Sequence, residues 1–291
     1  MIDSLLVSGG AGSFGSAFVR RLLATNAANR ICVLSRSEHT QAALRQQLND
    51  DPRMRWFIGD VRDRDRLKRA MQGVDVVVHA AALKRIEVGH FNPIELCRTN
   101  VDGSINVIEA SQDAGVKKVV ALSSDKACFP CSAYGASKAL MESLFLAANN
   151  TVAADGPRFS VTRYGNVWNS ASSVVPTWRS MVESGAKAVP VSSPEVTRFF
   201  MSMDQAVDLV LDTIATMQGG ELNIPDLPAY RLGDLAEAMG VKMVVKGLPD
   251  WEKKDEMMRA GEPSDLARRM SVEELKYQLE LIGYKAPARA A

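Results

Sequence analysis

A tyrosine and a lysine stand four residues apart, at Tyr134 and Lys138, in a segment whose pattern predicts a helix over residues 133–148. This spacing places both side chains on one face of a helix. An ammonium group beside a phenol favours the phenolate and so lowers the pKa of the phenol. The pair therefore predicts that Tyr134 can serve as a general base near neutral pH. A Y-x-x-x-K match is also common on ordinary surfaces, so its weight depends on where the helix lies.

Three glycines, Gly9, Gly12 and Gly15, separate a short apolar run over residues 2–7 from a helical pattern that extends to about Ala24. Glycines between a strand and a helix allow a tight turn and a close approach of the backbone to a pyrophosphate. Their G-x-x-G-x-x-G spacing differs from the common G-x-G-x-x-G pattern. A plain tight turn is the alternative, but the strand and helix on either side favour a dinucleotide site.

The residues after the second predicted strand bear on which dinucleotide is bound. NAD-specific sites place an acidic residue here to hold the ribose 2′-hydroxyl. This chain instead has Ser35 and Arg36. Because a guanidinium fork matches phosphate geometry, the pattern favours NADP over NAD, with a plain surface arginine as the alternative. Asp60, after the third predicted strand, is expected to bond the adenine amino group.

Strand and helix patterns alternate along the first half of the chain. Strands are predicted over residues 2–7, 31–34, 54–58, 74–79, 119–122 and 159–162, and further helices over residues 38–48 and 101–110. In the helix at 38–48, Ala42, Leu44 and Leu48 form the expected inner face. This order predicts an α/β fold, a doubly wound parallel sheet of the Rossmann type with both faces covered. Tyr134 and Lys138 would then lie beyond the carboxyl ends of the strands, where such sheets bind ligands.

Glycine, proline and serine punctuate shorter elements after Asn166, which indicates a second lobe. We expect residues 1–165 to form an NADP-binding domain, to which residues 199–225 return. Residues 166–198 and 226–291 would form a smaller substrate-binding lobe. Ser271 and Glu274 have capping-box spacing, which predicts the start of a terminal helix.

Composition excludes several classes of protein. The 35 basic and 34 acidic residues give a formal net charge of +1, whereas nucleic-acid binders usually carry a basic excess. Neither a membrane-spanning apolar window nor a signal-peptide pattern is present in the sequence, and four cysteines are too few for a disulfide scaffold. Cys128 and Cys131 lack a second pair of metal ligands nearby, so no metal is expected. We therefore expect a cytoplasmic protein without nucleic-acid or membrane partners.

Taken together, these motifs resemble those of an extended short-chain dehydrogenase/reductase. The resemblance rests on the glycine trio, His79-Ala80-Ala81-Ala82, Asn100, Ser123-Ser124 and Tyr134-x-x-x-Lys138. Over roughly residues 4–225 it narrows to the inverting UDP-N-acetylglucosamine 4,6-dehydratases of the polysaccharide-biosynthesis group. The Asp125-Lys126 pair is its most specific element.

The resemblance also implies which residues bind ligands. The implied cofactor contacts are Gly9, Gly12, Ser13, Phe14, Gly15, Ser35, Arg36, Asp60, Val61, Ala80, Ala81, Ala82, Asn100, Tyr134, Lys138, Tyr164, Asn166 and Val167. The implied contacts to a nucleotide-sugar substrate are Lys84, Asn166 and Arg198. Arg198 would pair with the diphosphate, since bidentate phosphate contacts suit arginine.

The same resemblance implies a mechanism. Tyr134, supported by Lys138, would take the C4 hydroxyl proton of the sugar while NADP accepts the C4 hydride. Lys126 would then remove the C5 proton, Asp125 would protonate the departing C6 hydroxyl, and Ser124 would bond the sugar near C4. The hydride would return to C6 and a proton to C5, so that the cofactor ends as it began.

Residues 247–256 (Gly247-Leu248-Pro249-Asp250-Trp251-Glu252-Lys253-Lys254-Asp255-Glu256) depart from the family pattern G-x-R-P-G-E-K-x-H-E, because the arginine is missing and Asp255 replaces the histidine. The resemblance still implies UDP as the nucleotide, but the changed residues leave a different base open. Two other enzyme activities on the same fold remain as alternatives. They are a 4-epimerase and a dehydratase that stops at a 5,6-unsaturated or otherwise altered product. A non-catalytic NADP-binding regulator is the alternative from a different class. A homo-oligomer is expected.

Overall fold

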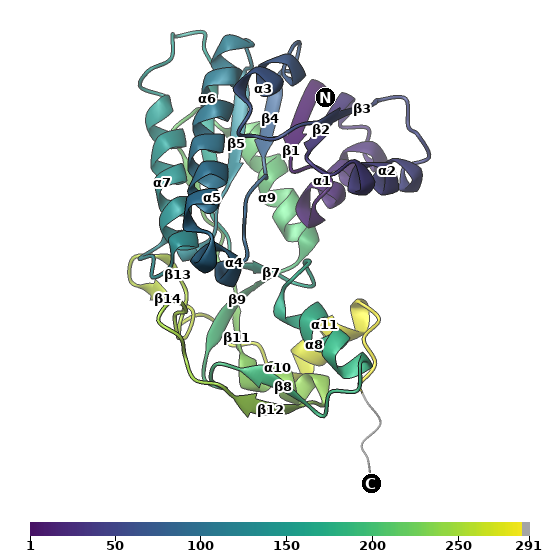
Figure 1. Cartoon of the computed structure of the whole chain (residues 1–291), viewed down its shortest axis with the longest axis vertical. Helices are drawn as coiled ribbons and strands as arrows, with labels where there is room; N and C mark the ends of the chain where they lie inside the picture. Colours follow the sequence, from purple (N-terminus) through teal and green to yellow (C-terminus); the bar gives the residue numbers. More distant parts are fainter. Residues whose placement is uncertain (287–291) are drawn as a thin grey trace.

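The computed structural model of this protein describes residues 1–286, and its largest feature is a parallel seven-stranded sheet (Figure 1). The strand order is β10-β6-β5-β4-β1-β2-β3. The strands are β1 (Ile2–Ser8), β2 (Ala28–Ser35), β3 (Met54–Ile58), β4 (Val76–His79), β5 (Lys118–Leu122), β6 (Arg158–Thr162) and β10 (Leu222–Asn223). The order runs outward in both directions from the junction of β1 and β4, which is the switch point of a doubly wound sheet. The predicted Rossmann-type fold is confirmed.

Alternate side chains of each strand build a separate core on each face of this sheet. On β1, Leu5 and Val7 belong to one buried cluster and Leu6 belongs to another, as the two-residue period of a strand requires. The helices that cover the first cluster are α1 (Ser13–Ala24) and α9 (Met203–Thr216). Those that cover the second are α3 (Arg64–Ala70), α6 (Gly103–Asp113) and α7 (Ala133–Ala148).

The helix α2 (Glu38–Gln47) has a different inner face from the one predicted. Leu44 is buried, but Ala42 is exposed and Leu48 is only half-buried. Gln41 is buried instead, because its side-chain amide donates hydrogen bonds to β2 and to the backbone of β3. The buried position on the inner face of α2 is therefore taken by a polar side chain, whose hydrogen-bond partners lie on β2 and β3.

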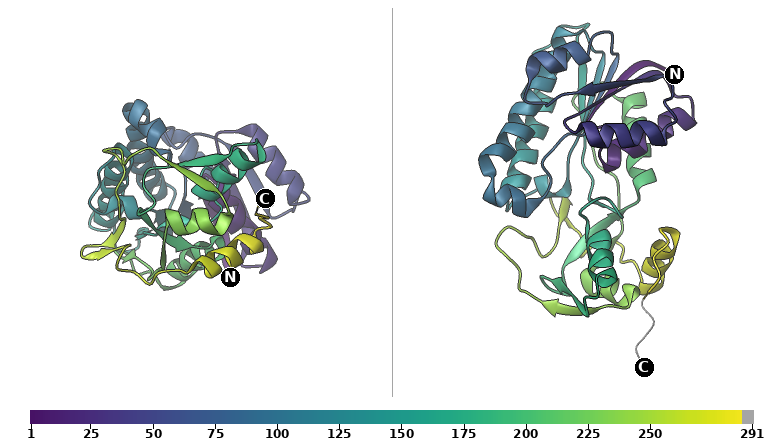
Figure 2. Two further views of the ribbon diagram at one scale, coloured as in Figure 1. Left: turned by 90° about the horizontal axis from the view of Figure 1, so that it is seen from below. Right: turned by 45° about the vertical axis from the view of Figure 1, so that its right-hand side comes forward.

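A smaller lobe lies beyond the carboxyl edge of the large sheet (Figure 2). Its elements are β7 (Asn166–Val167), α8 (Val174–Glu183), β8 (Ala188–Val191), β9 (Thr197–Met201), β11 (Ala229–Arg231), α10 (Leu232–Met239), β12 (Lys242–Val245), β13 (Met257–Arg259), β14 (Glu262–Pro263) and α11 (Val272–Leu281). Ser271 and Glu274 form a capping box at the start of α11, which confirms the predicted helix. The lobe has its own core around Trp168, Trp178 and Tyr230.

Short helical turns connect these parts. They are α4 (Ile86–Phe91), α5 (Pro93–Cys97), a π-helical turn (Arg98–Asp102) that continues into α6, and a 3₁₀ turn (Asp125–Ala127) after β5. The helix predicted over residues 101–110 thus begins earlier and ends later than expected. Among residues 1–286, no helix is both long enough and apolar enough to cross a membrane.

Strand β9 belongs to both lobes. It pairs with β7 and β11 in the smaller lobe. Its side chains Phe199 and Met201 nevertheless pack in the core of the large sheet, while Phe200 packs in the core of the smaller lobe. The chain then returns to the large sheet through α9 and β10. The domain boundary predicted at residue 199 remains a proposal, and it falls inside this shared strand.

Candidate active site

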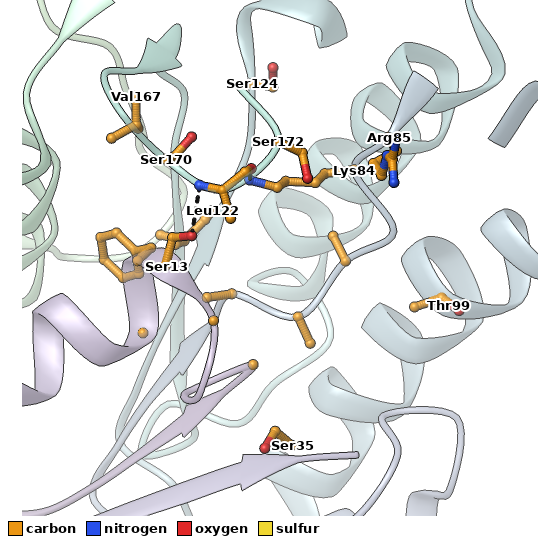
Figure 3. Close-up of a pocket in the computed structure, with 18 of the residues that line it drawn as sticks. Ser13, Ser35, Lys84, Arg85, Thr99, Leu122, Ser124, Val167, Ser170 and Ser172 are labelled. Atoms are coloured by element: carbon orange, nitrogen blue, oxygen red, sulfur yellow. Dashed lines mark hydrogen bonds between the residues drawn. The ribbon is translucent and has the colours of Figure 1, made fainter. Parts of the chain in front are cut away.

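A cavity of about 790 Å³ opens beyond the carboxyl ends of the central strands (Figure 3). Most of the predicted site residues line it, although they come from many separate turns. Those that line it are Gly9, Gly12, Ser13, Phe14, Gly15, Ser35, Arg36, Asp60, Val61, Ala80, Ala81, Ala82, Lys84, Ser124, Lys126, Tyr134, Lys138, Tyr164, Asn166 and Val167. The structure does not place Asn100, Asp125 or Arg198 on the cavity wall.

Two glycines of the trio, Gly9 and Gly15, occupy positions in the turn where a side chain would clash with the backbone. Gly9 has a φ of +70°, and a Cβ there would lie 2.9 Å from the backbone nitrogen of Ala81. A Cβ at Gly15 would lie 2.5 Å from the Cα of Gly10. The helix α1 follows Gly12, and no side chain within the described residues caps it. Its first backbone N–H groups can therefore meet an anion such as a pyrophosphate.

Ser35, Arg36 and Asp60 lie together along the part of the cavity formed by the ends of β2 and β3. The carboxylate of Asp60 accepts hydrogen bonds from the backbone nitrogen of Arg62 at 3.0 Å and from its guanidinium group at 2.7 Å. Burial raises the pKa of Asp60, but Arg62 lowers it below its ordinary value. This part of the wall thus combines an ionised acceptor with an exposed arginine and a hydroxyl group.

Tyr134 and Lys138 are both buried near the start of α7, but their electrostatics differ from the prediction. The Nζ of Lys138 donates to the backbone oxygen of Leu122 at 2.5 Å, and burial lowers the pKa of Lys138 to about 8. Burial also raises the pKa of Tyr134, and the cation that lowers it is Lys126. The predicted fall in the pKa of the phenol through Lys138 is therefore wrong, because desolvation dominates and the lysine bonds to a strand end.

Lys126 is the centre of a buried cluster of charges. Its Nζ lies 3.1 Å from Oδ1 of Asp125, 3.1 Å from Oδ1 of Asn166 and 3.2 Å from Oε1 of Glu256. Asp125 is fully buried, and its Oδ1 also accepts a hydrogen bond from Oγ of Ser124 at 2.7 Å. An ammonium group has three N–H donors, and these three acceptors match them in number.

The two carboxylates of this cluster differ in their affinity for a proton. Burial lowers the pKa of Lys126, but Asp125 and Glu256 raise it above its ordinary value. Burial raises the pKa of Asp125. Burial also opposes ionisation of Glu256, yet Lys126, Arg198 and Lys253 lower its pKa to about 2. Glu256 therefore stays ionised, and Asp125 is the carboxylate that is easier to protonate.

Sequence reasoning did not select Glu256 as a site residue. It lies far from Lys126 along the chain, and no local spacing connects the two residues. One signal was present, since Glu256 keeps the final glutamate of the family's C-terminal pattern although Asp255 replaces the histidine before it.

Arg198 does not line the cavity, contrary to the prediction. Its buried guanidinium group pairs with Glu252 and donates to the backbone oxygens of Lys253 and Lys254, both at 3.1 Å. A guanidinium group with these partners has few N–H donors left for a diphosphate. In this structure Arg198 instead holds the segment that precedes Glu256.

Asn100 is also buried away from the cavity wall. Its side chain accepts from the backbone nitrogen of Leu83 at 2.8 Å and donates to the backbone oxygen of Leu83 and to Oγ of Ser137, both at 3.0 Å. In this structure, Asn100 therefore acts on the cavity wall only indirectly. Asn100 fixes the backbone between Ala82 and Lys84, which do line the cavity.

A loop of residues 170–173 forms another part of the wall. The backbone nitrogen of Ala171 donates to Oγ of Ser13 at 3.1 Å, and Nζ of Lys84 donates to the oxygen of Ala171 at 2.8 Å. Ser13 and Lys84 both point toward this loop in Figure 3. These two bonds join the glycine turn of the large sheet to the first loop of the smaller lobe.

Comparison with known proteins agrees with this geometry. The family model described as "Polysaccharide biosynthesis protein" matches residues 5–275. The chain belongs to this family. Within the polysaccharide biosynthesis protein family, it is 43% identical over 265 residues to a UDP-N-acetylglucosamine 4,6-dehydratase (inverting) of Campylobacter jejuni, across 90% of this chain and 79% of that protein. The predicted resemblance to the extended short-chain dehydrogenase/reductases is thus confirmed.

Two further similar proteins help to define the similarity. The chain is 40% identical over 239 residues to a UDP-glucose 4-epimerase of Rickettsia conorii, across 81% of this chain and 70% of that protein. The X-ray structure of Pen from Bacillus thuringiensis superposes with a TM-score of 0.91 at 30% identity, across 97% of this chain and 98% of that one. The similarity in fold therefore extends over both lobes.

Replacing Gly9 with alanine tests the glycine turn. The new Cβ would combine a positive φ with a 2.9 Å contact to the backbone of Ala81. We expect affinity for a nicotinamide dinucleotide to fall at least about tenfold, which is about 1.4 kcal/mol of binding free energy. The measurement is a fluorescence titration with NADPH.

Gly115→Ala is the matched control, because Gly115 has the same φ of +70° but no described atom within 4 Å of its Cβ position. It should cost folding stability through backbone strain while leaving NADPH affinity unchanged. An equal loss of affinity in both variants would contradict a specific role for the turn at Gly9.

Proposed function

We propose that this protein is a nucleotide-sugar 4,6-dehydratase that holds NADP tightly throughout turnover. The observation that carries the proposal is that Lys126 and Tyr134 line one cavity, with the buried carboxylate of Asp125 hydrogen-bonded to Lys126 and Ser124 directly behind that wall. An epimerase needs proton transfer only at the C4 oxygen, whereas a dehydratase needs a further base at C5 and an acid at C6. This site has candidates for all three groups. The proposed substrate is UDP-N-acetylglucosamine or a related nucleotide sugar, and the product is a 4-keto-6-deoxy sugar.

A nicotinamide dinucleotide fits the residues at the glycine turn. Gly9 and Gly15 leave no room for a Cβ, and α1 begins with uncapped N–H groups within the described structure, as a pyrophosphate site requires. Ser35 and Arg36 support NADP, since a hydroxyl and a guanidinium group suit a 2′-phosphate. When bound, the nicotinamide supplies reversible hydride transfer, so that oxidation at C4 and reduction at C6 need no external reductant.

The protein's own residues would then move protons in order. Lys126, as an ammonium ion, favours the phenolate of Tyr134, which takes the C4 hydroxyl proton while Ser124 bonds the sugar. A ketone at C4 acidifies the C5–H bond. Lys126, once neutral, removes the C5 proton, and Asp125, once protonated, gives its proton to the C6 hydroxyl, which leaves as water. A proton finally returns to C5, with inversion if it arrives on the opposite face, and the name of the Campylobacter relative supports inversion.

A nucleotide-sugar 4-epimerase is the second candidate, and the 40% identity to the Rickettsia protein favours it. In that case Asp125 and Lys126 would shape the pocket without moving protons. The two functions differ in one product, because only a dehydratase releases water.

Lys84 and Asn166 remain the residues that we propose as contacts to the nucleotide sugar, since both line the cavity. Arg198 is not retained, because its guanidinium group is already paired. UDP is proposed from the name of the Campylobacter relative. A homo-oligomer in the cytoplasm remains part of the proposal.

Replacing Lys126 with alanine tests the dehydratase directly. It removes the proposed C5 base, so we expect water loss from UDP-N-acetylglucosamine to fall at least about 1,000-fold, as for loss of an essential acid–base group. NADP binding should be unchanged. Mass spectrometry of the product measures the first quantity and fluorescence titration the second.

The control for this experiment is Lys276→Ala, which changes an exposed lysine of α11 and should retain full activity. Water loss at the unaltered rate in the Lys126 variant would show that another group is the base at C5.

Replacing Arg36 with alanine tests the choice of dinucleotide. Removing the proposed 2′-phosphate partner should weaken NADP binding by roughly 10- to 100-fold, the range for a hydrogen bond to a charged group. Affinity for NAD, which lacks that phosphate, should change less than about twofold. Parallel loss of both affinities would contradict phosphate recognition by Arg36. Arg69→Ala, which changes an exposed arginine in the last turn of α3, serves as the control.

A further inference from the structure

Glu256 approaches Lys126 from a different part of the chain than Asp125 does. Asp125 precedes Lys126 in the turn after β5, whereas Glu256 immediately precedes β13, which lies beside the lower end of α7 in Figure 1. Glu256 is only 2% exposed and Asp125 is 0% exposed. A buried carboxylate must be paired to be stable. Glu256 has Lys126 at 3.2 Å and Lys253 at 3.1 Å as its partners.

The segment that carries Glu256 is fixed at several points. The backbone nitrogen of Glu256 donates to Oγ of Ser264 at 2.9 Å, and the backbone nitrogen of Ser264 donates to the oxygen of Glu256 at 2.8 Å. The guanidinium group of Arg163 donates to the backbone oxygen of Met258 at 2.7 Å. Lys253 also donates to the backbone of the loop before α7 at 2.7 Å. The carboxylate therefore lies against Lys126 as part of a built structure.

We propose that Glu256 is a positioning residue of the reaction centre, which holds Nζ of Lys126 in place and leaves Asp125 as the carboxylate that takes the lysine's proton. This inference rests on the proposed dehydratase function. It adds a residue from the smaller lobe to a catalytic set otherwise drawn from the large sheet.

An ammonium ion cannot act as a base, so Lys126 must first lose a proton. Both Asp125 and Glu256 are close enough to accept it. The pKa of Glu256 is lowered to about 2 by its cationic neighbours, against the effect of burial, so Glu256 resists protonation. The pKa of Asp125 is raised by burial, and Glu256 raises it further.

The proton transfer is balanced within the cluster. One N–H bond of Lys126 breaks and one O–H bond forms on Asp125, so the summed charge of the two groups does not change. The products are a neutral amine and a carboxylic acid, which are the base for C5 and the acid for the C6 hydroxyl. Glu256 keeps its negative charge throughout.

Several charged or titratable groups face Glu256 from the surrounding elements. They are Asp125 and Lys126 in the turn after β5, Cys131 in the loop before α7, Tyr134 on α7, Arg198 on β9 and Lys253 on its own segment. The negative charge of Glu256 raises the pKa of Asp125, Lys126 and Tyr134 alike. The active form has one proton shared by Asp125 and Lys126, so the activity should rise and then fall with pH.

Glu256→Gln keeps the shape of the side chain and removes its charge. Because every pKa that Glu256 raises must then fall, both limbs of the pH profile of kcat should move to lower pH, by at least about half a unit. We expect kcat to fall about tenfold while KM changes less than about threefold. A merely structural role would lower the rate without moving the limbs.

Asp255→Asn is the matched control, since it removes the neighbouring negative charge, whose carboxylate accepts a hydrogen bond from Thr197 rather than from Lys126. Its pH profile should match that of the unaltered protein. Glu256→Asp keeps the negative charge but places it farther from Lys126. Both limbs of its pH profile should therefore shift in the same direction as in Glu256→Gln, but by a smaller amount. This variant also tests the proposal if the glutamine variant fails to fold.

Failure of the proposed function and failure of this inference are distinguishable. If the unaltered protein removes water from no nucleotide sugar, the proposed function fails. An NMR titration of the Lys126 amine, with ¹⁵N-labelled lysine, then still decides the inference. A lower pKa of Lys126 in Glu256→Gln than in the unaltered protein supports the inference. An unchanged pKa of Lys126, or a pH profile of kcat whose limbs do not move, overturns it.

Discussion

The site depends on one electrostatic constraint, which is that the Lys126 ammonium group is buried between two carboxylates. A buried amine without counter-charges would lose its proton, and buried carboxylates without a cation would be unstable. Together the three groups stabilise one another, with Asn166 as the remaining acceptor. Because one carboxylate comes from the turn after β5 and the other from the segment before β13, this cluster also joins the two lobes.

The rest of the structure supplies the surroundings of that cluster. The parallel sheet brings six turns to one edge, and its switch point opens the cavity there. The glycine turn provides uncapped N–H groups within the described residues at one end, and Tyr134 stands at the other. Hydrogen bonds from Ala171 to Ser13 and from Lys84 to Ala171 close the wall between them.

Local patterns predicted the sheet, the glycine turn and the Tyr134–Lys138 pair, because strand period, glycine spacing and the Y-x-x-x-K spacing are short-range properties. Most of the other residues of the cavity wall were implied only by the resemblance to a known family. Such patterns cannot predict contacts between segments that lie far apart in the sequence. Glu256 was missed because its partner Lys126 lies in another lobe, and Arg198 was misassigned because Glu252 takes its guanidinium group. The predicted effect of Lys138 on Tyr134 was wrong for a related reason. Four-residue spacing places two residues on one face, but the direction of a lysine side chain depends on the acceptor that it finds, here the end of β5.

The most direct measurement of the central claim is the position of solvent deuterium in the product. The purified protein would be incubated with NADP and a panel of UDP-, GDP-, CMP- and dTDP-sugars in deuterated water, followed by mass spectrometry and NMR. The account predicts loss of one water from one of these sugars, with a single deuterium at C5 and none at C6, because the C6 hydrogen returns from C4. Deuterium at C6, or an epimerised sugar that has lost no water, would contradict it.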